Sequence, residues 1–261
     1  MITSRHHDLV KQFRRLARDD DERFALIDGW HLLEEAIVSG VRIRTIAITA
    51  SRDEASSLLS RAQDAGVEIL QVSTKVMEAI SPVRTPTGVA AIVERKSRAL
   101  SELLRPSPAL VVVASDMQDP GNVGALIRST EAGGGTGVAL VGSSADPWSW
   151  KGLRAAMGST FRLPVLRTRD GESLMSSLHT ASVRIMASVP RGGTDWSRVD
   201  WTAPVAILLG GEGQGLTKAM VQQADEQVSI PMTRPVESLN AAVAAALLVY
   251  EARRQRSSGG S

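Results

Sequence analysis

Three short segments of the chain combine glycine or small polar residues with side chains that could take part in catalysis. The first, DMQDPGNVGALIR, spans Asp116–Arg128, and the second, LLGGEGQGL, spans Leu208–Leu216. The third begins with SIPM at Ser229 and continues with ESLN at Glu237–Asn240. Each segment follows an apolar run typical of a buried strand, and α/β sheets bind ligands where such strands end. These segments are therefore the candidate functional site.

The glycine-rich second segment suits a flat ligand, but it lacks both common nucleotide-binding patterns. Leu216 stands where the Gly-x-Gly-x-x-Gly fingerprint needs its last glycine, and no Gly-Lys-Ser/Thr follows as a phosphate-binding loop requires. Glycines without those features still let backbone N–H and C=O groups approach the edge of a ring such as adenine. A structural tight turn is the alternative interpretation.

The first and third segments also have simpler interpretations, as the starts of helices. The run Asp119-Pro120-Gly121-Asn122 has the composition of a turn that enters a helix. Ser238 is a candidate N-cap for the apolar run AAVAAALLVYEA that follows it. Capping by Ser238 does not account for the neighbouring amide of Asn240.

The elements that must position these segments alternate between strand and helix. Beyond Ala109, apolar strand signals at 109–115, 137–141, 183–187, 205–209 and 227–230 are separated by helical segments. Continuous apolar strands separated by helices predict a parallel sheet covered on both faces. Residues 1–94 show a similar alternation and predict a smaller α/β unit. The charged stretch 95–108 ends in two prolines and predicts a linker or a short connecting helix.

We therefore expect an α/β protein of two domains. The predicted limits are an N-terminal α/β domain at 1–94, a linker at 95–108, a parallel-sheet domain at 109–256 and a flexible tail at 257–261. The charged N-terminus and the lack of a long apolar run favour a cytoplasmic protein that has no membrane partner. Four scattered histidines show no metal-ligand spacing, so we expect no metal.

Taken together, the three segments resemble the signature motifs of the SpoU, or TrmH-type, branch of the SPOUT RNA methyltransferases in order, spacing and nearly every polar residue. The resemblance covers about residues 109–256, and LVKQFRRL and DGWHLLEEAI near the N-terminus are similar to the small RNA-binding domain of many members. It implies a SPOUT domain with a deep C-terminal trefoil knot, S-adenosylmethionine as the cofactor and a homodimer.

The resemblance also implies roles for individual residues. The backbone at six positions would cradle the cofactor: Leu209, Gly210, Gly211, Ile230, Met232 and Leu239. The family's catalytic positions fall on Asn122, Arg128, Glu212, Ser238 and Asn240. The second protomer would complete the active site through Arg128.

The implied reaction is transfer of a methyl group from the cofactor's sulfonium to a ribose 2′-oxygen of structured RNA. The enzyme must align the oxygen with the methyl group and help to remove its proton. Arg128 is the family's proposed base, yet a guanidinium with a pKa above about 12 also suits stabilisation of a phosphate or an oxyanion. Both roles stay open. Glu212 and Asn122 would orient this guanidinium, while Ser238 and Asn240 would hold the ribose or the methionine end of the cofactor.

The composition agrees with oxygen or nitrogen methylation. The chain of 261 residues has no cysteine, which excludes a thiolate zinc site and disfavours C5 methylation of pyrimidines, because that reaction usually needs a cysteine nucleophile. A nucleotide-dependent dehydrogenase is disfavoured as well, because the glycine fingerprint after the domain's first strand is missing.

A formal net charge of +2 cannot attract a polyanion by itself, so contacts with RNA must be local. One basic patch occupies the first 18 residues, and its candidate RNA-binding residues are Arg5, Lys11, Arg14 and Arg15. A second closes the last helix with Arg253, Arg254 and Arg256. Ordinary solvated helix faces are the alternative interpretation of both patches. Trp148 and Trp150, near Lys151 and Arg154, are candidates for core packing or for stacking on a base.

Ribosomal RNA is the favoured substrate because of the N-terminal domain. A tRNA 2′-O-methyltransferase is one alternative, and a catalytically silent RNA-binding or ribosome-assembly factor is another. The five intact catalytic positions argue against the silent factor. A housekeeping role and a role in antibiotic resistance both stay open.

Overall fold

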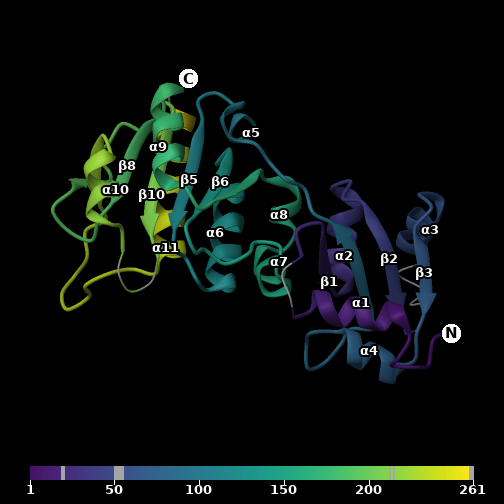
Figure 1. Ribbon diagram of the computed structural model, residues 1–261. Helices are drawn as coiled ribbons and strands as arrows, with labels where there is room; N and C mark the ends of the chain where they lie inside the picture. Colours follow the sequence, from purple (N-terminus) through teal and green to yellow (C-terminus); the bar gives the residue numbers. More distant parts are fainter. Residues whose placement is uncertain (19–20, 50–55, 212, 214, 259–261) are drawn as a thin grey trace. The chain divides into compact units, whose positions relative to one another are not determined.

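The computed structural model describes residues 1–18, 21–49, 56–211, 213 and 215–258, which form two compact units (Figure 1). The small unit contains Met1–Lys96 together with Asp146–Arg162. The large unit contains Ser97–Ala145 and Leu163–Ser261. None of the helices in the described ranges is both long enough and apolar enough to cross a membrane.

The small unit is built on a four-stranded sheet in the order β1-β4-β2-β3. Its strands are β1 (Phe24–Asp28), β2 (Ile43–Ile48), β3 (Glu68–Gln71) and β4 (Val89–Glu94). Its helices are α1 (Asp8–Leu16), α2 (Trp30–Val38), α3 (Ser56–Asp64), α4 (Thr74–Ile80), α7 (Trp150–Ala156) and α8 (Ser159–Arg162). Strand β4 pairs antiparallel with β1 and β2, whereas β2 and β3 are parallel.

Both faces of this sheet are covered, which explains why its strands are apolar at successive positions. Helix α1 places Val10, Phe13 and Leu16 against one face, where α4 also packs. Helices α2 and α3 pack on the other face, which contains Ala25 and Ile27 of β1. Successive strand residues point to opposite faces, so each face receives its own row of apolar side chains.

Residues 146–162 belong to the core of the small unit, although the sequence analysis places them in the C-terminal domain. Arg95 and Asp146 form a buried bidentate ion pair with both N–O distances at 2.8 Å. Trp148 packs on Phe161 with ring centroids 5.8 Å apart, and both residues join the core beneath α2. Trp148 is therefore a core residue and is not exposed to stack on an RNA base.

The large unit contains a seven-stranded sheet in the order β7-β6-β5-β10-β8-β11-β9. Its strands are β5 (Leu110–Ser115), β6 (Gly137–Val141), β7 (Val165–Thr168), β8 (Arg184–Ser188), β9 (Thr194–Asp195), β10 (Val205–Gly210) and β11 (Glu226–Ser229). Its helices are α5 (Leu100–Leu104), α6 (Pro120–Ala132), α9 (Gly171–Thr180), α10 (Lys218–Gln223) and α11 (Ala241–Ser258). Every strand pair is parallel, which confirms the predicted parallel sheet.

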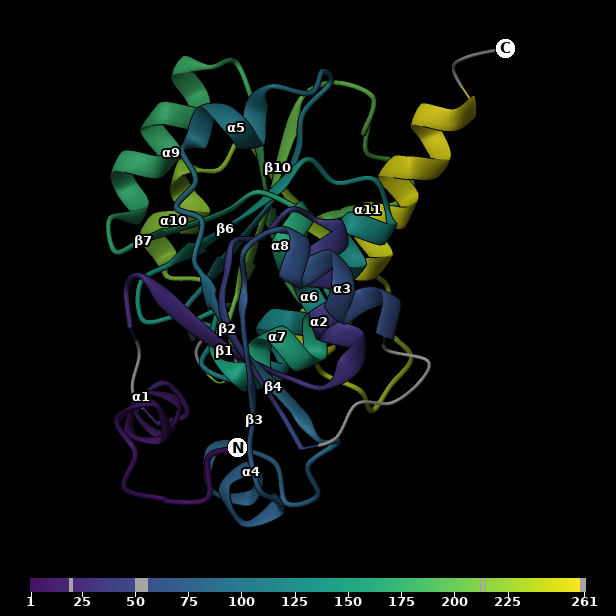
Figure 2. The same ribbon diagram turned by 90° about the vertical axis from the view of Figure 1, so that its right-hand side faces the viewer.

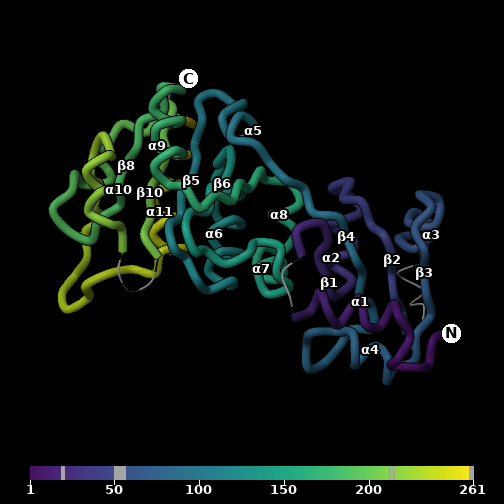
Figure 3. The backbone as a smooth tube through the Cα atoms, in the orientation of Figure 1, coloured from purple at the N-terminus to yellow at the C-terminus, as the bar shows by residue number. Residues whose placement is uncertain are grey.

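Helices cover both faces of this sheet (Figure 2). Helices α6 and α11 lie on one face, where they meet Val112 and Ala114 of β5. Helices α5, α9 and α10 lie on the other, against Val111 and Val113. The chain runs from β10 through α10 and β11 into α11, which returns alongside α6 (Figure 3). Helix α5 occupies part of the predicted linker, so this stretch contains the short connecting helix that was the alternative to an extended linker.

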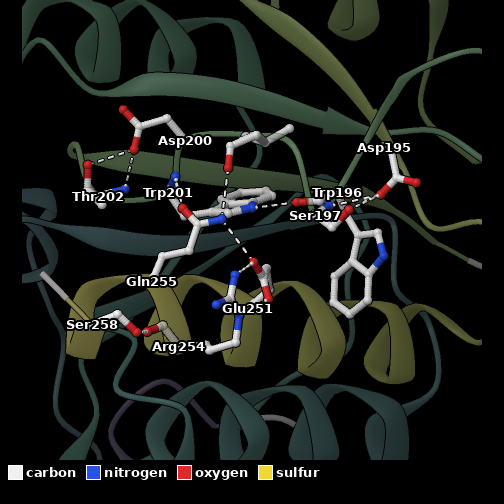
Figure 4. A network of polar contacts seen from close by, with 11 residues as sticks. Asp195, Trp196, Ser197, Asp200, Trp201, Thr202, Glu251, Arg254, Gln255 and Ser258 are labelled. Carbon is white, nitrogen blue, oxygen red and sulfur yellow. Dashed lines mark hydrogen bonds and ion pairs between the residues drawn. The ribbon is translucent and has the colours of Figure 1, made fainter.

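Helix α11 is fastened to the segment before β10 by a polar network around the fully buried Trp201 (Figure 4). The Gln255 side chain accepts from the backbone N–H of Trp201 at 3.0 Å and donates to the Val199 carbonyl at 2.9 Å. Glu251 accepts from both Gln255 and Arg254, and hydrogen bonds from Arg254 lower the pKa of this carboxyl. The network ties the last helix to the rest of the large unit.

The arginines of the basic patch predicted at the end of this helix have partners within the chain, and their contact with RNA stays a prediction. Arg256 donates to four backbone carbonyls, those of Pro108, Ala109, Trp201 and Ala203, at 2.8–3.0 Å. Arg254 pairs with Glu251, and Arg253 donates to the carbonyl of Ala132. The helix also continues to Ser258, so residues 257 and 258 of the predicted tail are helical, and 259–261 lie outside the described residues.

We predict that Arg256→Ala lowers the free energy of unfolding by about 2–4 kcal/mol, because several carbonyls then lose their donor at once. Arg253→Ala removes the same charge from the same helix but only one carbonyl contact, so we expect a loss below about 1 kcal/mol. Urea unfolding followed by circular dichroism measures both. Equal losses would contradict the structural role of Arg256.

Candidate functional site

A pocket of about 540 Å³ opens beside the carboxyl ends of β8, β10 and β11. Ser188–Pro190 after β8 forms one wall, and the glycine loop that follows β10 forms another. Residues between Ile230 and Ala244, including the start of α11, close the remaining side. The pocket thus lies where α/β sheets generally bind ligands, at the carboxyl ends of parallel strands.

The second and third sequence segments meet in this pocket. All six predicted cofactor positions line it: Leu209, Gly210, Gly211, Ile230, Met232 and Leu239. Ser238 and Asn240, two of the predicted catalytic residues, line it as well. The structure brings these residues together, while their individual roles stay predictions.

The glycine loop folds so tightly that two of its residues have no room for a side chain. A Cβ on Gly210 would lie 2.2 Å from the carbonyl carbon of Gly215, and one on Gly211 would lie 2.1 Å from the backbone oxygen of Asp116. Gly211 and Gly215 pair in an isolated antiparallel bridge, and Gly215 has a φ of +65°. The same loop therefore forms a tight turn and also lines the pocket, so the two interpretations of this segment do not exclude each other.

Asn122 and Asn240 connect the first segment to the third. Asn240 Nδ2 donates to Asn122 Oδ1 at 3.1 Å, although 118 positions separate the two residues. Asp119 caps α6 by accepting from the backbone N–H of Asn122 at 2.8 Å. This cap fixes the start of the helix that carries Asn122.

Asn240, and not Ser238, caps helix α11. Its Oδ1 accepts from the backbone N–H groups of Ala242 at 2.9 Å and Val243 at 3.3 Å. The predicted cap at Ser238 is wrong because the helix begins at Ala241, so Asn240 and not Ser238 directly precedes it. One amide side chain thus both caps α11 and holds Asn122, which leaves the Ser238 hydroxyl available at the pocket wall.

Asp116 is a residue of the site to which the sequence analysis gave no role. It follows β5 with a φ of 55°, and its carboxylate accepts from the backbone N–H and hydroxyl of Ser143 and from the Ser115 hydroxyl. These hydrogen bonds lower the pKa of the Asp116 carboxyl, so it stays ionised. Because its backbone oxygen lies against Gly211, the carboxylate helps to fix one side of the glycine loop. Its position directly after a buried strand is the sequence feature that could have identified Asp116 as a residue of the site.

Arg128 lies apart from these residues within one chain. Its side chain is exposed on α6 and is not among the residues that line the pocket. Six residues separate it from Asn122, which places the two side chains about 120° apart around the helix. The fifth predicted catalytic residue, Glu212, lies outside the described residues.

The predicted RNA-binding residues of the N-terminal arm are exposed, but most have partners within the chain. Lys11 pairs with Asp8 and Arg15 with Asp21, both at 2.8 Å. Arg5 donates to the backbone carbonyl of Lys75 at 3.3 Å, and Arg14 is exposed on α1. In the described ranges, no three histidine, aspartate or glutamate side chains form a group that could hold a metal ion.

We predict that Gly211→Ala weakens S-adenosylmethionine binding at least about tenfold, because the backbone atoms of Asp116 and Met117 cannot yield to the new Cβ. Gly215→Ala is the matched control in the same loop: its Cβ would meet open space, and only the left-handed backbone costs about 1–2 kcal/mol. Isothermal titration calorimetry measures both affinities. A stronger effect at Gly215 would contradict this account of the loop.

Comparisons with known proteins agree in both units. Residues 109–250 match the SpoU rRNA Methylase family, and residues 8–91 match an MRM3-like substrate binding domain. An uncharacterized tRNA/rRNA methyltransferase of Synechocystis is 33% identical, over 98% of this chain and 94% of its own length. The 23S rRNA (guanosine(2553)-2′-O)-methyltransferase RlmP of Bacillus subtilis is 30% identical, over 97% and 98% of the two chains.

A solved structure is similar over nearly the whole chain. The SpoU methyltransferase AviRb from Streptomyces viridochromogenes, in complex with the cofactor AdoMet, superposes with a TM-score of 0.88. It is 27% identical, and the match covers 97% of this chain and 99% of that one. The three sequence segments, the parallel sheet and the full-length relatives lead to one conclusion: the chain belongs to the SpoU methylase family of RNA methyltransferases.

Proposed function

We propose that this protein transfers the methyl group of S-adenosylmethionine to a ribose 2′-hydroxyl of ribosomal RNA. The observation that carries the proposal is the pocket at the end of β10, whose glycine wall stands next to the linked amides of Asn122 and Asn240. AviRb, a similar protein, binds AdoMet, and RlmP, a relative, is a 2′-O-methyltransferase of 23S rRNA.

The pocket residues fit this cofactor. Leu209, Ile230 and Leu239 provide apolar side chains for the faces of an adenine ring. Gly210 and Gly211 line the pocket, where their backbone N–H and C=O groups would read the edge of that ring. A volume of about 540 Å³ lies within the range of small-molecule and cofactor sites. Bound there, the cofactor supplies an electrophilic methyl group.

The polar residues at the pocket would orient the ribose. Asn240 is held by the helix it caps, and one N–H of its amide remains for a ligand after the bond to Asn122. The Ser238 hydroxyl, freed from capping, can donate to or accept from a ribose oxygen. Rigid groups of this kind lower the entropic cost of aligning the 2′-oxygen with the methyl group.

The exposed position of Arg128 leads us to propose that it acts in the pocket of a second protomer. Helix α11 presents an apolar stripe to solvent, formed by Val243, Leu247 and Tyr250 at 36–49% exposure. The stripe borders α6, since Tyr250 lies close to Gly133 at the end of that helix. Apolar stripes of this kind mark protein interfaces, and a symmetric dimer here would place Arg128 near the interface.

In the partner's pocket, the Arg128 guanidinium would stabilise the negative charge of the 2′-oxygen or of a neighbouring phosphate. This role suits an arginine better than removal of a proton, because the group stays charged at neutral pH. The trefoil knot, the cytoplasmic location and the role of Glu212 stay predictions.

The direct test is transfer of radiolabelled methyl from S-adenosylmethionine to unmodified ribosomal RNA and to tRNA, followed by nucleoside analysis. We expect a labelled 2′-O-methylnucleoside from ribosomal RNA. Arg128→Ala should lower the rate by about 100-fold or more, as for loss of one group that stabilises the transition state, with unchanged cofactor affinity. If only tRNA is labelled, the substrate is tRNA and not ribosomal RNA. Cofactor binding without transfer to either RNA would support a silent assembly factor.

We predict that Leu247→Glu converts a dimer into a monomer, because it places a charge in the middle of the apolar stripe. The rate of methyl transfer should also fall, because in a monomer Arg128 no longer reaches a partner's pocket. Val38→Glu is the matched control, because Val38 is an exposed valine of α2 in the small unit. Sedimentation equilibrium measures the mass of each variant. A Leu247→Glu dimer with wild-type activity would refute the interface.

A further inference from the structure

Helix α7 brings two cations and an indole to the end of β1 in the small unit. Leu153 points inward and packs in the core with Ala25 and Ile27 of β1. Trp150, Lys151 and Arg154 fall within about 100° of one another around the helix. Lys151 and Arg154 lie about 160° and 100° from the buried Leu153, and Trp150 lies about 60° from it. Lys151 and Arg154 are exposed, and Trp150 is partly exposed.

The positive charge of this helix is not neutralised nearby. Helix α7 contains Lys151 and Arg154 but no aspartate or glutamate, whereas Arg162 of α8 pairs with Glu35. Within the described residues, no carboxylate reaches ion-pair distance of Lys151 or Arg154, and the ammonium group of Lys151 lies 5.6 Å from the centre of the Trp150 ring. Both cations thus remain available to a ligand.

Asp28 is the carboxyl group that Arg154 faces, and it lies inside the unit. One of its oxygens is buried without a hydrogen-bond partner. Burial raises the pKa of the Asp28 carboxyl, while Ser81 and Arg154 act in the opposite direction. Within the described residues, Asp28 forms no ion pair with Arg154, so the guanidinium can still contact a ligand.

A second indole stands at the same end of the sheet. Trp30 follows β1 by two residues and is partly exposed. Its Nε1 donates to the backbone carbonyl of Thr87 at 3.2 Å, which holds the ring in place. The hydroxyls of Thr49 and Thr87 lie beside the same turn, near Gly88 and Gly29. Cations, fixed aromatic rings and hydroxyl groups are the groups with which proteins bind phosphates, bases and ribose of unpaired RNA.

We propose that Trp30, Trp150, Lys151 and Arg154, here called the α7 surface, dock a single-stranded segment of the substrate RNA. Lys151 and Arg154 contact phosphates, and Trp150 stacks on a base. The inference rests on the proposed function and deepens it, because it assigns the form of RNA that the small unit recognises. Residues of the C-terminal half of the sequence thereby take part in substrate binding.

The α7 surface is better suited to a polyanion than the N-terminal arm. Lys11 and Arg15 of the arm already pair with Asp8 and Asp21, and an RNA phosphate must compete with these carboxylates. Within the described residues, no carboxylate lies within ion-pair distance of Lys151, and Asp28, which Arg154 faces, has a buried oxygen and forms no ion pair. We therefore expect the larger part of the salt-dependent affinity to come from α7.

The test uses the full-length protein and two fluorescein-labelled probes, a single-stranded oligoribonucleotide of about 12 residues and its duplex form. Affinity is measured by fluorescence anisotropy over a range of salt concentrations. Lys151→Ala together with Arg154→Ala should weaken binding of the single strand about tenfold and reduce the slope of log K against log salt by about 1.4, or about 0.7 for each lost phosphate contact. Trp150→Ala should weaken binding about five- to tenfold with an unchanged slope, because stacking releases no counterions.

Arg61→Ala is the matched control, because it removes an exposed arginine from α3, which packs at the β3 edge opposite β1. We expect wild-type affinity and slope. Arg154 faces the buried Asp28, so its loss could destabilise the small unit. The melting temperature and the cofactor affinity of the double variant must therefore equal those of the wild type. Lys151→Ala alone, with a slope reduced by about 0.7, serves if the double variant does not fold.

Two outcomes overturn the inference. One is wild-type affinity and slope in the Lys151 and Trp150 variants, and the other is tighter binding of the duplex than of the single strand. Methyl transfer by the wild-type protein separates this inference from the proposed function. If the protein methylates RNA while these variants bind it normally, only the α7 surface is refuted. If it methylates no RNA, the proposed function fails, and the affinities still decide whether α7 binds RNA.

Discussion

The parallel pairing of β5 with β10 is the interaction on which the candidate site depends. It sets Gly210 directly opposite Ser115, so the ends of two strands 95 positions apart meet at one edge of the sheet. Asp116 and Gly211 follow those ends and touch through their backbones. Helix α6 starts from one strand end and α11 returns beside it, which allows Asn122 and Asn240 to bond. A shift in this register would separate Asp116 and Asn122, which follow β5, from the glycine loop that follows β10.

Much of the large unit was predictable because its signals are local. Strands buried on both faces have continuous apolar runs, and this property identified β5, β6, β8, β10 and β11 to within a residue or two. The glycine loop was identified for a similar reason, since it must turn where no side chain fits. The roles of single residues were harder. Whether Ser238 or Asn240 caps α11 depends on where the helix begins, and helix ends are weakly marked in sequence.

Long-range partners explain what the sequence could not indicate. The arginines at the end of α11 look like an RNA patch in the sequence, but Arg256 instead bonds four carbonyls from two distant segments. Arg95 is similarly committed, to the buried carboxylate of Asp146. Arg154 has the same side chain and no such partner in the described part of the chain. Burial and partners, which depend on the tertiary fold, decide whether an arginine holds the structure together or faces solvent.

The position of residues 146–162 affects how such a protein can evolve. The segment that matches the SpoU family begins at residue 109, yet Trp148, Leu153 and Phe161 fill the core of the small unit. A gene fusion that joined this catalytic half to a foreign partner would leave these three side chains without their apolar neighbours. Recombination at the apparent border is therefore selected against, and the two halves are expected to be inherited together. Their histories should coincide, although their sequences match separate families.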